Sequence, residues 1–258
     1  MDFEHLPLLE TQRRLYAIPR GMERFQSYLA AITDATGDLA LPLAAMNPMG
    51  KEHVAALVDA LLGMDAEEAA AEALEQAGRR LAAVPGRLRF GLVVTDDAAG
   101  GWTNRFFSEF HNHFQHNPLL DRGWGVAYLW TSDPWDRAAV FAETLASAYR
   151  SAALLRRGSP RTLAQVLDLA GRAALFAGQP APPLDADDLE YTRTVIQPYT
   201  GSDNYPTVFT CLYGDAAARE VGYPPLGLSP RAGLAVAISD AYSRGGDPAE
   251  ALIRSDMD

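Results

Sequence analysis

The sequence predicts a helix-rich α/β protein, in which a small and mostly parallel sheet of three or four strands is covered by helices. Two observations lead to this fold class: helical segments alternate with short apolar runs between residues 39 and 156, and helical patterns dominate the back half of the chain. The 258 residues are 48% hydrophobic, which is enough to bury a sizeable core, either as one large domain or as two small ones. We expect a single domain over residues 1–258, with a helical C-terminal region from about residue 159 packed on the sheet.

The strands are expected where short apolar runs are bounded by turn-forming residues. Residues 88–95 (LRFGLVVT) and 125–131 (GVAYLWT) are rich in β-branched and aromatic residues, as buried parallel strands are. Residues 39–46 (LALPLAAM) have a similar pattern, but Pro42 limits their pairing and predicts an edge strand. Residues 206–214 (PTVFTCLYG) are the fourth candidate strand.

The helices are expected from apolar periodicity and from residues that start helices. Asp65 and Asp247 each stand three residues before a glutamate, which is the pattern of a capping box. Pro134, Pro160 and Pro230 are expected at the first helical position, which does not need a backbone N–H. We expect helices over residues 20–35, 51–63, 66–83, 103–116, 134–156, 160–177, 186–197, 230–244 and 248–254.

Charge and cysteine content exclude several classes of protein. The net charge of -11 argues against partners with a phosphate backbone and against anionic membrane surfaces, so we expect neither nucleic acid nor membrane as a partner. The N-terminus lacks the features of a secretory signal, which predicts a cytoplasmic protein. The single cysteine, Cys211, has apolar neighbours and is expected to be a buried, unreactive thiol.

A ligand site is expected at the carboxyl ends of the strands, where loops and helix N-termini converge in open parallel sheets. The loops NPMGKEH, DDAAGGWTNR and SDPWD follow three of the candidate strands. Lys51 is the single lysine beside 21 arginines, and it stands where a helix begins, so its compact ammonium is a candidate anion ligand. The candidate substrate-binding residues of these loops are Asn47, Lys51, Trp102, Asn104 and Arg105.

The helix expected over residues 103–116 carries two different stripes. One is aromatic and is expected to dock the helix on the sheet; it contains Phe106, Phe107, Phe110 and Phe114. The adjacent stripe contains Glu109, His113 and His116, whose spacing would allow three ligands to one divalent metal. The metal interpretation is not favoured, because an ion pair between Arg105 and Glu109 also explains the stripe and no H-E-x-x-H pattern is present.

The function is predicted only as a choice between two classes. No G-x-x-x-x-G-K-[ST], G-x-G-x-x-G or G-x-S-x-G pattern is present, so neither a nucleotide nor a specific cofactor is predicted. The first hypothesis is a hydrolase or transferase acting on a small polar or anionic molecule, with Asp96, Glu109 and His113 as catalytic residues. The alternative is a non-catalytic ligand-binding or protein-interaction scaffold. The sequence makes no prediction of the substrate or of the oligomeric state.

Overall fold

The computed structural model describes residues 1–98 and 104–254. The chain divides into two compact units, one built from Met1–Arg105 and Pro118–Ala148 and the other from Phe106–Asn117 and Tyr149–Asp258. The first is the sheet unit and the second is the helical unit. The expectation of one domain stays a prediction.

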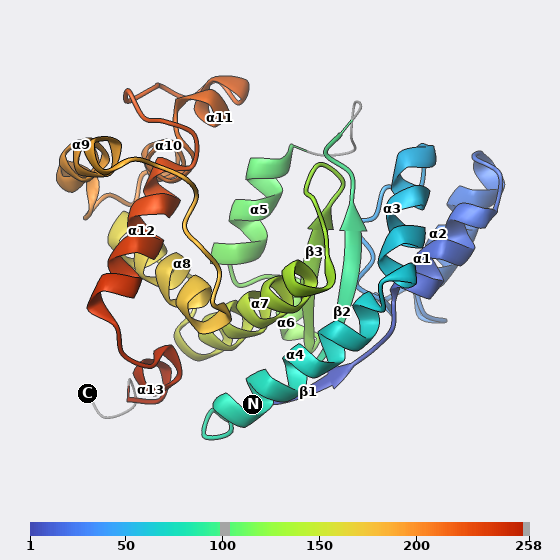
Figure 1. Ribbon diagram of the computed structural model, residues 1–258. Coiled ribbons are helices and arrows are strands. Elements are labelled where there is room, and N and C mark those ends of the chain that lie inside the picture. The colour runs from blue at the N-terminus through green and yellow to red at the C-terminus, as the bar shows by residue number, and fades with distance from the viewer. Residues whose placement is uncertain (99–103, 255–258) are drawn as a thin grey trace. The chain divides into compact units, whose positions relative to one another are not determined.

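The sheet unit contains a three-stranded parallel sheet with the order β1-β2-β3 (Figure 1). Its strands are β1 (Asp2–His5), β2 (Arg87–Thr95) and β3 (Trp124–Trp130). The central strand is buried without interruption from Phe90 to Thr95, as expected for a parallel strand covered on both faces. The predicted class, a helix-rich α/β fold with a small parallel sheet, is confirmed.

Helices surround this sheet within the same unit. They are α1 (Leu9–Ala17), α2 (Met22–Ile32), α3 (Glu52–Gly63), α4 (Ala66–Arg80), α6 (Pro118–Asp121) and the first part of α7 (Arg137–Arg157). Helices α1, α3 and α4 each contact β2, and α4 also lies along β1. Five of the six alanines of α4 are fully buried, which allows its backbone to approach the strands closely.

A single glutamine completes the hydrogen bonding of the central strand. Strand β1 pairs with β2 only as far as Phe90, so the next residues of β2 lack a neighbouring strand on that side. The fully buried side chain of Gln12 fills this gap, because its Nε2 donates to Leu92 O at 2.9 Å and its Oε1 accepts from Val94 N at 2.8 Å. The α1 side chain thus replaces one peptide group of a missing strand.

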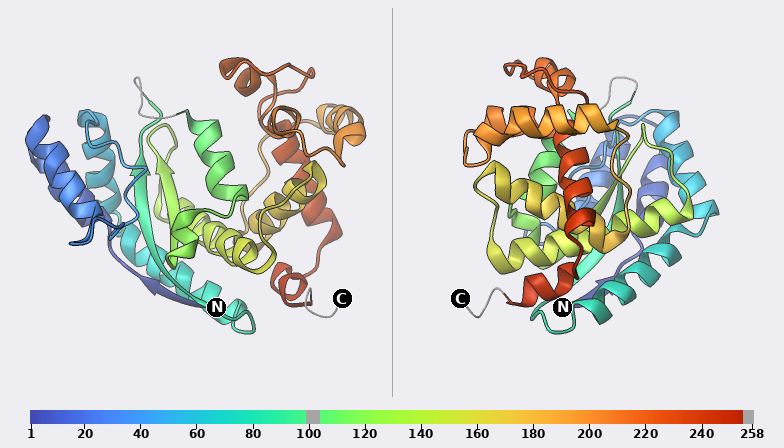
Figure 2. Two further views of the ribbon diagram at one scale, coloured as in Figure 1. Left: turned by 180° about the vertical axis from the view of Figure 1, so that it is seen from behind. Right: turned by 60° about the vertical axis from the view of Figure 1, so that its left-hand side comes forward.

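The helical unit consists of helices packed around a hydrophobic core of their own. Its elements are α5 (Arg105–Phe114) from its second residue, the end of α7, α8 (Leu163–Ala177), α9 (Ala186–Ile196), the 3₁₀ helix η1 (Gln197–Tyr199), α10 (Tyr205–Tyr213), α11 (Asp215–Glu220), α12 (Ala232–Arg244) and α13 (Pro248–Arg254). Helices α8 and α12 lie side by side (Figure 2). Gly171 permits this approach, since a Cβ there would lie 2.4 Å from the carbonyl oxygen of Ala237.

The aromatic stripe of α5 packs against α10 in this unit. The ring centroids of Phe110 and Tyr205 are 4.8 Å apart, and those of Phe106 and Tyr213 are 5.3 Å apart. Phe107 stacks on Tyr205 but keeps 36% of its surface exposed. The expectation that this stripe docks on the sheet is corrected, because the rings belong to the core of the helical unit.

Two of the four candidate strands are wrong. Residues 39–46 form bends and turns, with one isolated bridge between Thr33 and Leu39, because Pro42 interrupts the run as proline does in a ladder. Residues 206–213 belong to helix α10, with Gly214 as its C-cap, and the helix start is fixed by Asn204 accepting from Thr207 N at 3.1 Å. The strands over 88–95 and 125–131 and the nine predicted helices are confirmed. The short elements β1, α1, α6, η1 and α11 were not predicted.

Several helix starts differ from the predicted ones. Helices α7, α8 and α12 begin two or three residues after the prolines, and Thr162 rather than Pro160 starts α8 by accepting from Gln165 N. Asp65 occupies the N-cap position of α4, but its φ is 57° and its side chain makes no capping hydrogen bond. Asp247 does accept a hydrogen bond from Ala249 N at 3.0 Å.

The Gln12 contacts predict the effect of replacing this residue. Gln12→Met keeps the side-chain length but leaves the buried Leu92 carbonyl and Val94 N–H unpaired, so we expect the free energy of unfolding to fall by about 2 to 4 kcal/mol. Chemical denaturation measures this change. The control is Gln26→Met on the exposed face of α2, which should change stability by less than about 0.5 kcal/mol. An equal effect of the two substitutions would contradict the role of Gln12.

Candidate functional site

The candidate site is built around a buried carboxylate directly after β2. The Asp96 side chain is 4% exposed and lies 2.8 Å from His53 Nε2. It also accepts hydrogen bonds from Asn47 Nδ2 at 3.1 Å and Thr131 Oγ1 at 3.1 Å. Burial alone would raise the pKa of Asp96, but the hydrogen bonds from His53, Asn47 and Thr131 outweigh it and lower the pKa. Asp96 is therefore an ionised anchor for His53.

The loop before α3 brings His53 to this carboxylate. Asn47 is buried, and its side chain bonds both Asp96 and the backbone N–H of Met49. The Asn47 carbonyl accepts from Tyr16 Oη at 2.8 Å and from Gly50 N at 2.9 Å. These contacts fix the turn after which α3 begins, and His53 is the second residue of that helix.

An open pocket of ≈ 610 Å³ lies beside His53, and it is lined by basic residues. Its lining includes Arg20, Arg24, Lys51 and His53, and Glu52 is the one carboxylate among the described lining residues. Lys51 is exposed at the N-cap position of α3, and this helix start has no side-chain cap. Three cationic side chains and a helix N-terminus give the pocket a positive potential.

Arg24 contributes a positive charge that backbone carbonyls hold in place. It is 7% exposed and donates to the carbonyl oxygens of Ile18 at 2.6 Å, Gly50 at 3.3 Å and Tyr16 at 3.3 Å. Among the residues that the structure describes, no carboxylate forms an ion pair with it. Burial lowers the pKa of this guanidinium, Tyr16 offsets part of that shift, and the charge of Arg20 adds to it. An anion in the pocket would offset these like charges.

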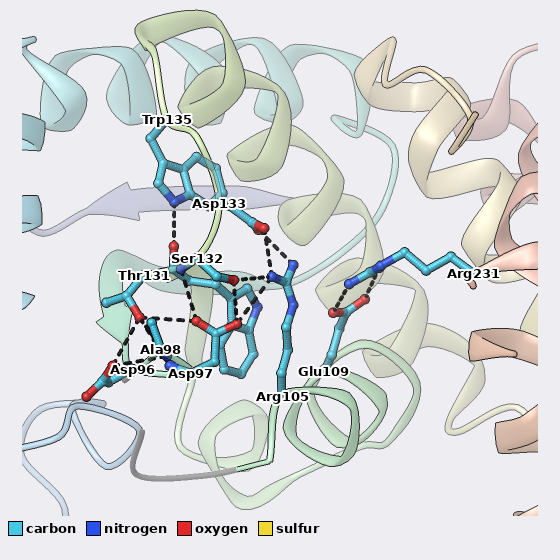
Figure 3. Close-up of polar contacts among 11 residues, drawn as sticks. Asp96, Asp97, Ala98, Arg105, Glu109, Thr131, Ser132, Asp133, Trp135 and Arg231 are labelled. Carbon is cyan, nitrogen blue, oxygen red and sulfur yellow. Dashed lines mark hydrogen bonds and ion pairs between the residues drawn. The ribbon is translucent and has the colours of Figure 1, made fainter. Parts of the chain in front are cut away.

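A second polar cluster lies at the ends of β2 and β3 (Figure 3). Arg105 forms a fork with Asp133, with Nη1–Oδ1 and Nη2–Oδ2 distances of 2.7 Å, and its Nη1 lies 3.3 Å from Asp97 Oδ2. Ser132 joins the cluster through its hydroxyl, 2.7 Å from Asp97. The guanidinium of Arg105 is thus shared between two carboxylates, which gives it a structural role in joining the strand ends.

The predicted residues of the α5 stripe lie in the helical unit and have other partners. Glu109 accepts two 2.9 Å hydrogen bonds from Arg231, whose φ of 56° is uncommon for a residue other than glycine (Figure 3). Burial, reinforced by Glu109, raises the pKa of the adjacent Tyr213 phenol well above its ordinary value. His113 Nε2 lies 3.3 Å from Arg150 Nη1, and His116 Nδ1 lies 3.4 Å from the Leu154 carbonyl.

The predicted site residues therefore fall into separate groups. Asn47 and Asp96 are in direct contact, and Lys51 lies in the pocket beside His53. Asn104 is half-buried just before α5, and Trp102 lies outside the described residues. Over residues 1–98 and 104–254, no group of three or more His, Cys, Asp or Glu side chains is placed to hold a metal ion, including Glu109, His113 and His116. Cys211 is fully buried, which raises the pKa of its thiol to about 12.

His53 was missed at the sequence level. It stands in the same NPMGKEH segment as Lys51, but a histidine in a first helical turn is indistinguishable from an ordinary polar residue until its partner is known. Its partner Asp96 is 43 residues away in the chain. Of the two residues in this pair, only Asp96 was predicted, because it directly follows a buried strand.

Comparisons with known proteins add no assignment. No family model, curated protein or solved structure matches the chain. Among the described helices, none combines the length and the apolar character that a membrane crossing requires.

The lowered pKa of Asp96 predicts a pH-dependent contribution to stability. A depressed carboxyl pKa stabilises the fold above the unfolded-state value of about 3.9, and this contribution disappears as pH falls through the folded-state pKa. We expect Asp96→Asn to lower the free energy of unfolding by about 1 to 3 kcal/mol at pH 7 and by progressively less as pH falls below about 3.9. Urea denaturation across this range, with the exposed Asp203→Asn as control, measures the difference. If the difference in unfolding free energy between the original protein and Asp96→Asn does not change with pH, the lowered pKa of Asp96 is contradicted.

The Glu109–Arg231 pair predicts a stability effect in the helical unit. Glu109→Ala leaves a half-buried guanidinium without its fork, so we expect a loss of about 2 to 3 kcal/mol. The control is Glu75→Ala, which removes an exposed pair with Arg79 and should change stability by less than about 0.5 kcal/mol. Thermal unfolding of both variants tests the contrast, and equal shifts would rule out a special role for the buried pair.

Proposed function

We propose that this protein is a hydrolase for small anionic substrates, and that His53 activates a water molecule in the basic pocket. The observation that carries the proposal is the His53–Asp96 contact at the wall of a pocket lined by Arg20, Arg24 and Lys51. A histidine held by a buried carboxylate next to an open cavity is the arrangement of a general base.

The hydrogen bond between His53 and Asp96 determines which nitrogen of His53 can accept a proton. Because Asp96 is ionised, it accepts a hydrogen bond from the protonated Nε2 of His53. This tautomer leaves Nδ1 as the proton acceptor, and the His53 side chain is 31% exposed. A water bound to Nδ1 would give up its proton as its oxygen attacks the substrate, and the imidazolium would then protonate the leaving group.

The pocket favours an anionic substrate and water as the nucleophile. Lys51 and Arg20 would bind the negative charge, and the start of α3 would add its positive dipole end, with Glu52 offsetting part of this charge. The described lining of this pocket contains no serine, threonine or cysteine. Of the two predicted reaction classes, hydrolysis is therefore favoured over transfer through an enzyme-bound nucleophile.

A non-catalytic anion-binding protein is the second candidate. Asp96 also bonds Asn47 and Thr131, so its contact with His53 could serve only to fasten the start of α3. The same cations would then bind an anion without turnover. The two candidates differ in one measurable outcome, which is whether loss of His53 removes catalysis or only weakens binding.

The test is hydrolysis of a panel of nitrophenyl phosphate, sulfate and succinate esters. We expect turnover of at least one ester, a decrease in kcat of about 10²- to 10⁴-fold in His53→Ala, and an increase mainly in KM in Lys51→Ala. The chain offers a matched control, because His5 and Glu67 form another 2.8 Å pair that is absent from the described lining of the pocket. His5→Ala should leave kcat unchanged.

The outcomes separate the candidates. Phosphate binding that depends on Lys51 without turnover of any ester would favour the binding protein. Turnover that survives His53→Ala would contradict the assignment of the base. If the protein neither binds phosphate nor hydrolyses any ester, both candidates are overturned.

A further inference from the structure

A different pocket lies in the helical unit, between the end of α7 and the start of α8. Its volume is ≈ 500 Å³, which suits a small organic molecule. Its lining includes Tyr149, Arg157, Arg161, Asp168, Leu169 and Arg172. None of these residues belongs to the site beside His53, so this pocket is independent of the proposed hydrolase.

The charge of this pocket is opposite to that of the chain. The protein has 33 acidic and 22 basic residues, yet the charged side chains in the described lining of this cavity are three arginines and one aspartate. Three positive charges and one negative charge leave a formal charge of about +2 at neutral pH. A phosphate monoester carries about -1.5 to -2 at this pH, whereas a simple carboxylate carries only about -1.

Two of the guanidiniums have donors that remain available. Arg172 Nε donates to Asp168 Oδ2 at 2.7 Å, and within the described ranges no acceptor bonds its two Nη groups. The Arg161 backbone N–H bonds Gln165, while its exposed guanidinium has no partner among the described residues. Planar guanidinium forks match phosphate oxygens in geometry, so these groups are suited to an oxyanion.

The positive charge comes from these side chains rather than from the start of α8. The N–H of Leu163 bonds the Ser202 carbonyl at 3.0 Å, and the N–H of Ala164 bonds the Thr200 carbonyl at 2.9 Å. The Gln165 N–H is capped by Thr162. The apolar part of the lining comes from Leu169, Ala153 and the ring of buried Tyr149, whose hydroxyl is already bonded to the Pro248 carbonyl.

We propose that this pocket binds a small phosphate monoester with an apolar or aromatic body. The phosphate lies between Arg161 and Arg172, and the body lies against Tyr149 and Leu169. Arg157 supplies the third positive charge from the end of α7, where its Nη2 also holds the Ala251 carbonyl at 2.5 Å. The ligand thereby connects the end of α7 with the first turns of α8.

Calorimetric titration of the full chain with phenyl phosphate tests this proposal. The titrations use the double variant Lys51→Ala/His53→Ala as background, so that the other pocket does not contribute. We expect Arg161→Ala and Arg172→Lys each to weaken the affinity by about tenfold or more, because each loses a charge-assisted contact. The control Arg79→Ala should bind as the background protein does. Benzoate and inorganic phosphate should bind more weakly than phenyl phosphate.

A labelling experiment locates the bound molecule. Phenylglyoxal modifies accessible arginines, and peptide mass spectrometry then reports each site separately. Phenyl phosphate should protect Arg161 and Arg172 but leave exposed Arg79 reactive. Absence of binding would overturn the proposal, as would an affinity of the Arg161→Ala and Arg172→Lys variants equal to that of the background protein, or protection of Arg20 alone.

Discussion

The buried negative charge of Asp96 constrains the whole edge of the sheet at which β2 ends. An ionised carboxylate that is 4% exposed is stable only when hydrogen-bond donors replace its lost water. Those donors come from the loop before α3, from α3 itself and from the residue after β3, namely Asn47, His53 and Thr131. The hydrogen bonds to this one carboxylate therefore hold together three segments that are distant in the sequence.

The same constraint explains why the candidate site can be precise although it lies on loops. Gln12 completes the backbone hydrogen bonds of β2 just before the strand ends, and Tyr16, one helical turn later in α1, bonds the Asn47 carbonyl. Helix α1 thus supports both the strand and the loop that surround Asp96. A histidine that is hydrogen-bonded to this carboxylate is held in a fixed position relative to the sheet. A general base requires such a fixed position.

Sequence patterns predicted the parts of this protein that depend on local information. The strands around Val93 and Tyr128 and the nine helices follow from apolar periodicity, and Asp96 follows from its place after a buried strand. The segment of α10 was misassigned because its apolar run fits a strand or a buried helix equally well, and the capping by Asn204 decides between them. Strand β1 has only four residues and is stabilised by its pairing with β2, which no local pattern reports.

The site residues show the limit of the same reasoning. The partner of Glu109 is Arg231, 122 residues away, and the partner of Asp133 is Arg105, 28 residues away. Spacing within one helix predicted an Arg105–Glu109 pair, but ion pairs form wherever the fold brings opposite charges together in a dry environment. His53 was missed for this reason, since its chemistry comes from a contact and not from its neighbours in the sequence.

Contact geometry alone does not assign a function either, as the two histidine–carboxylate pairs of the sheet unit show. His5 and Glu67 are as close as His53 and Asp96, at 2.8 Å. The second oxygen of Glu67 accepts from Leu9 N at 2.7 Å, so this pair fastens the start of α1 to α4. The His53 pair differs in its surroundings, because His53 borders a cavity whose other walls carry Arg20, Arg24 and Lys51. The functional argument for His53 therefore depends on what the cavity can hold, and the charge of its walls points to an anion.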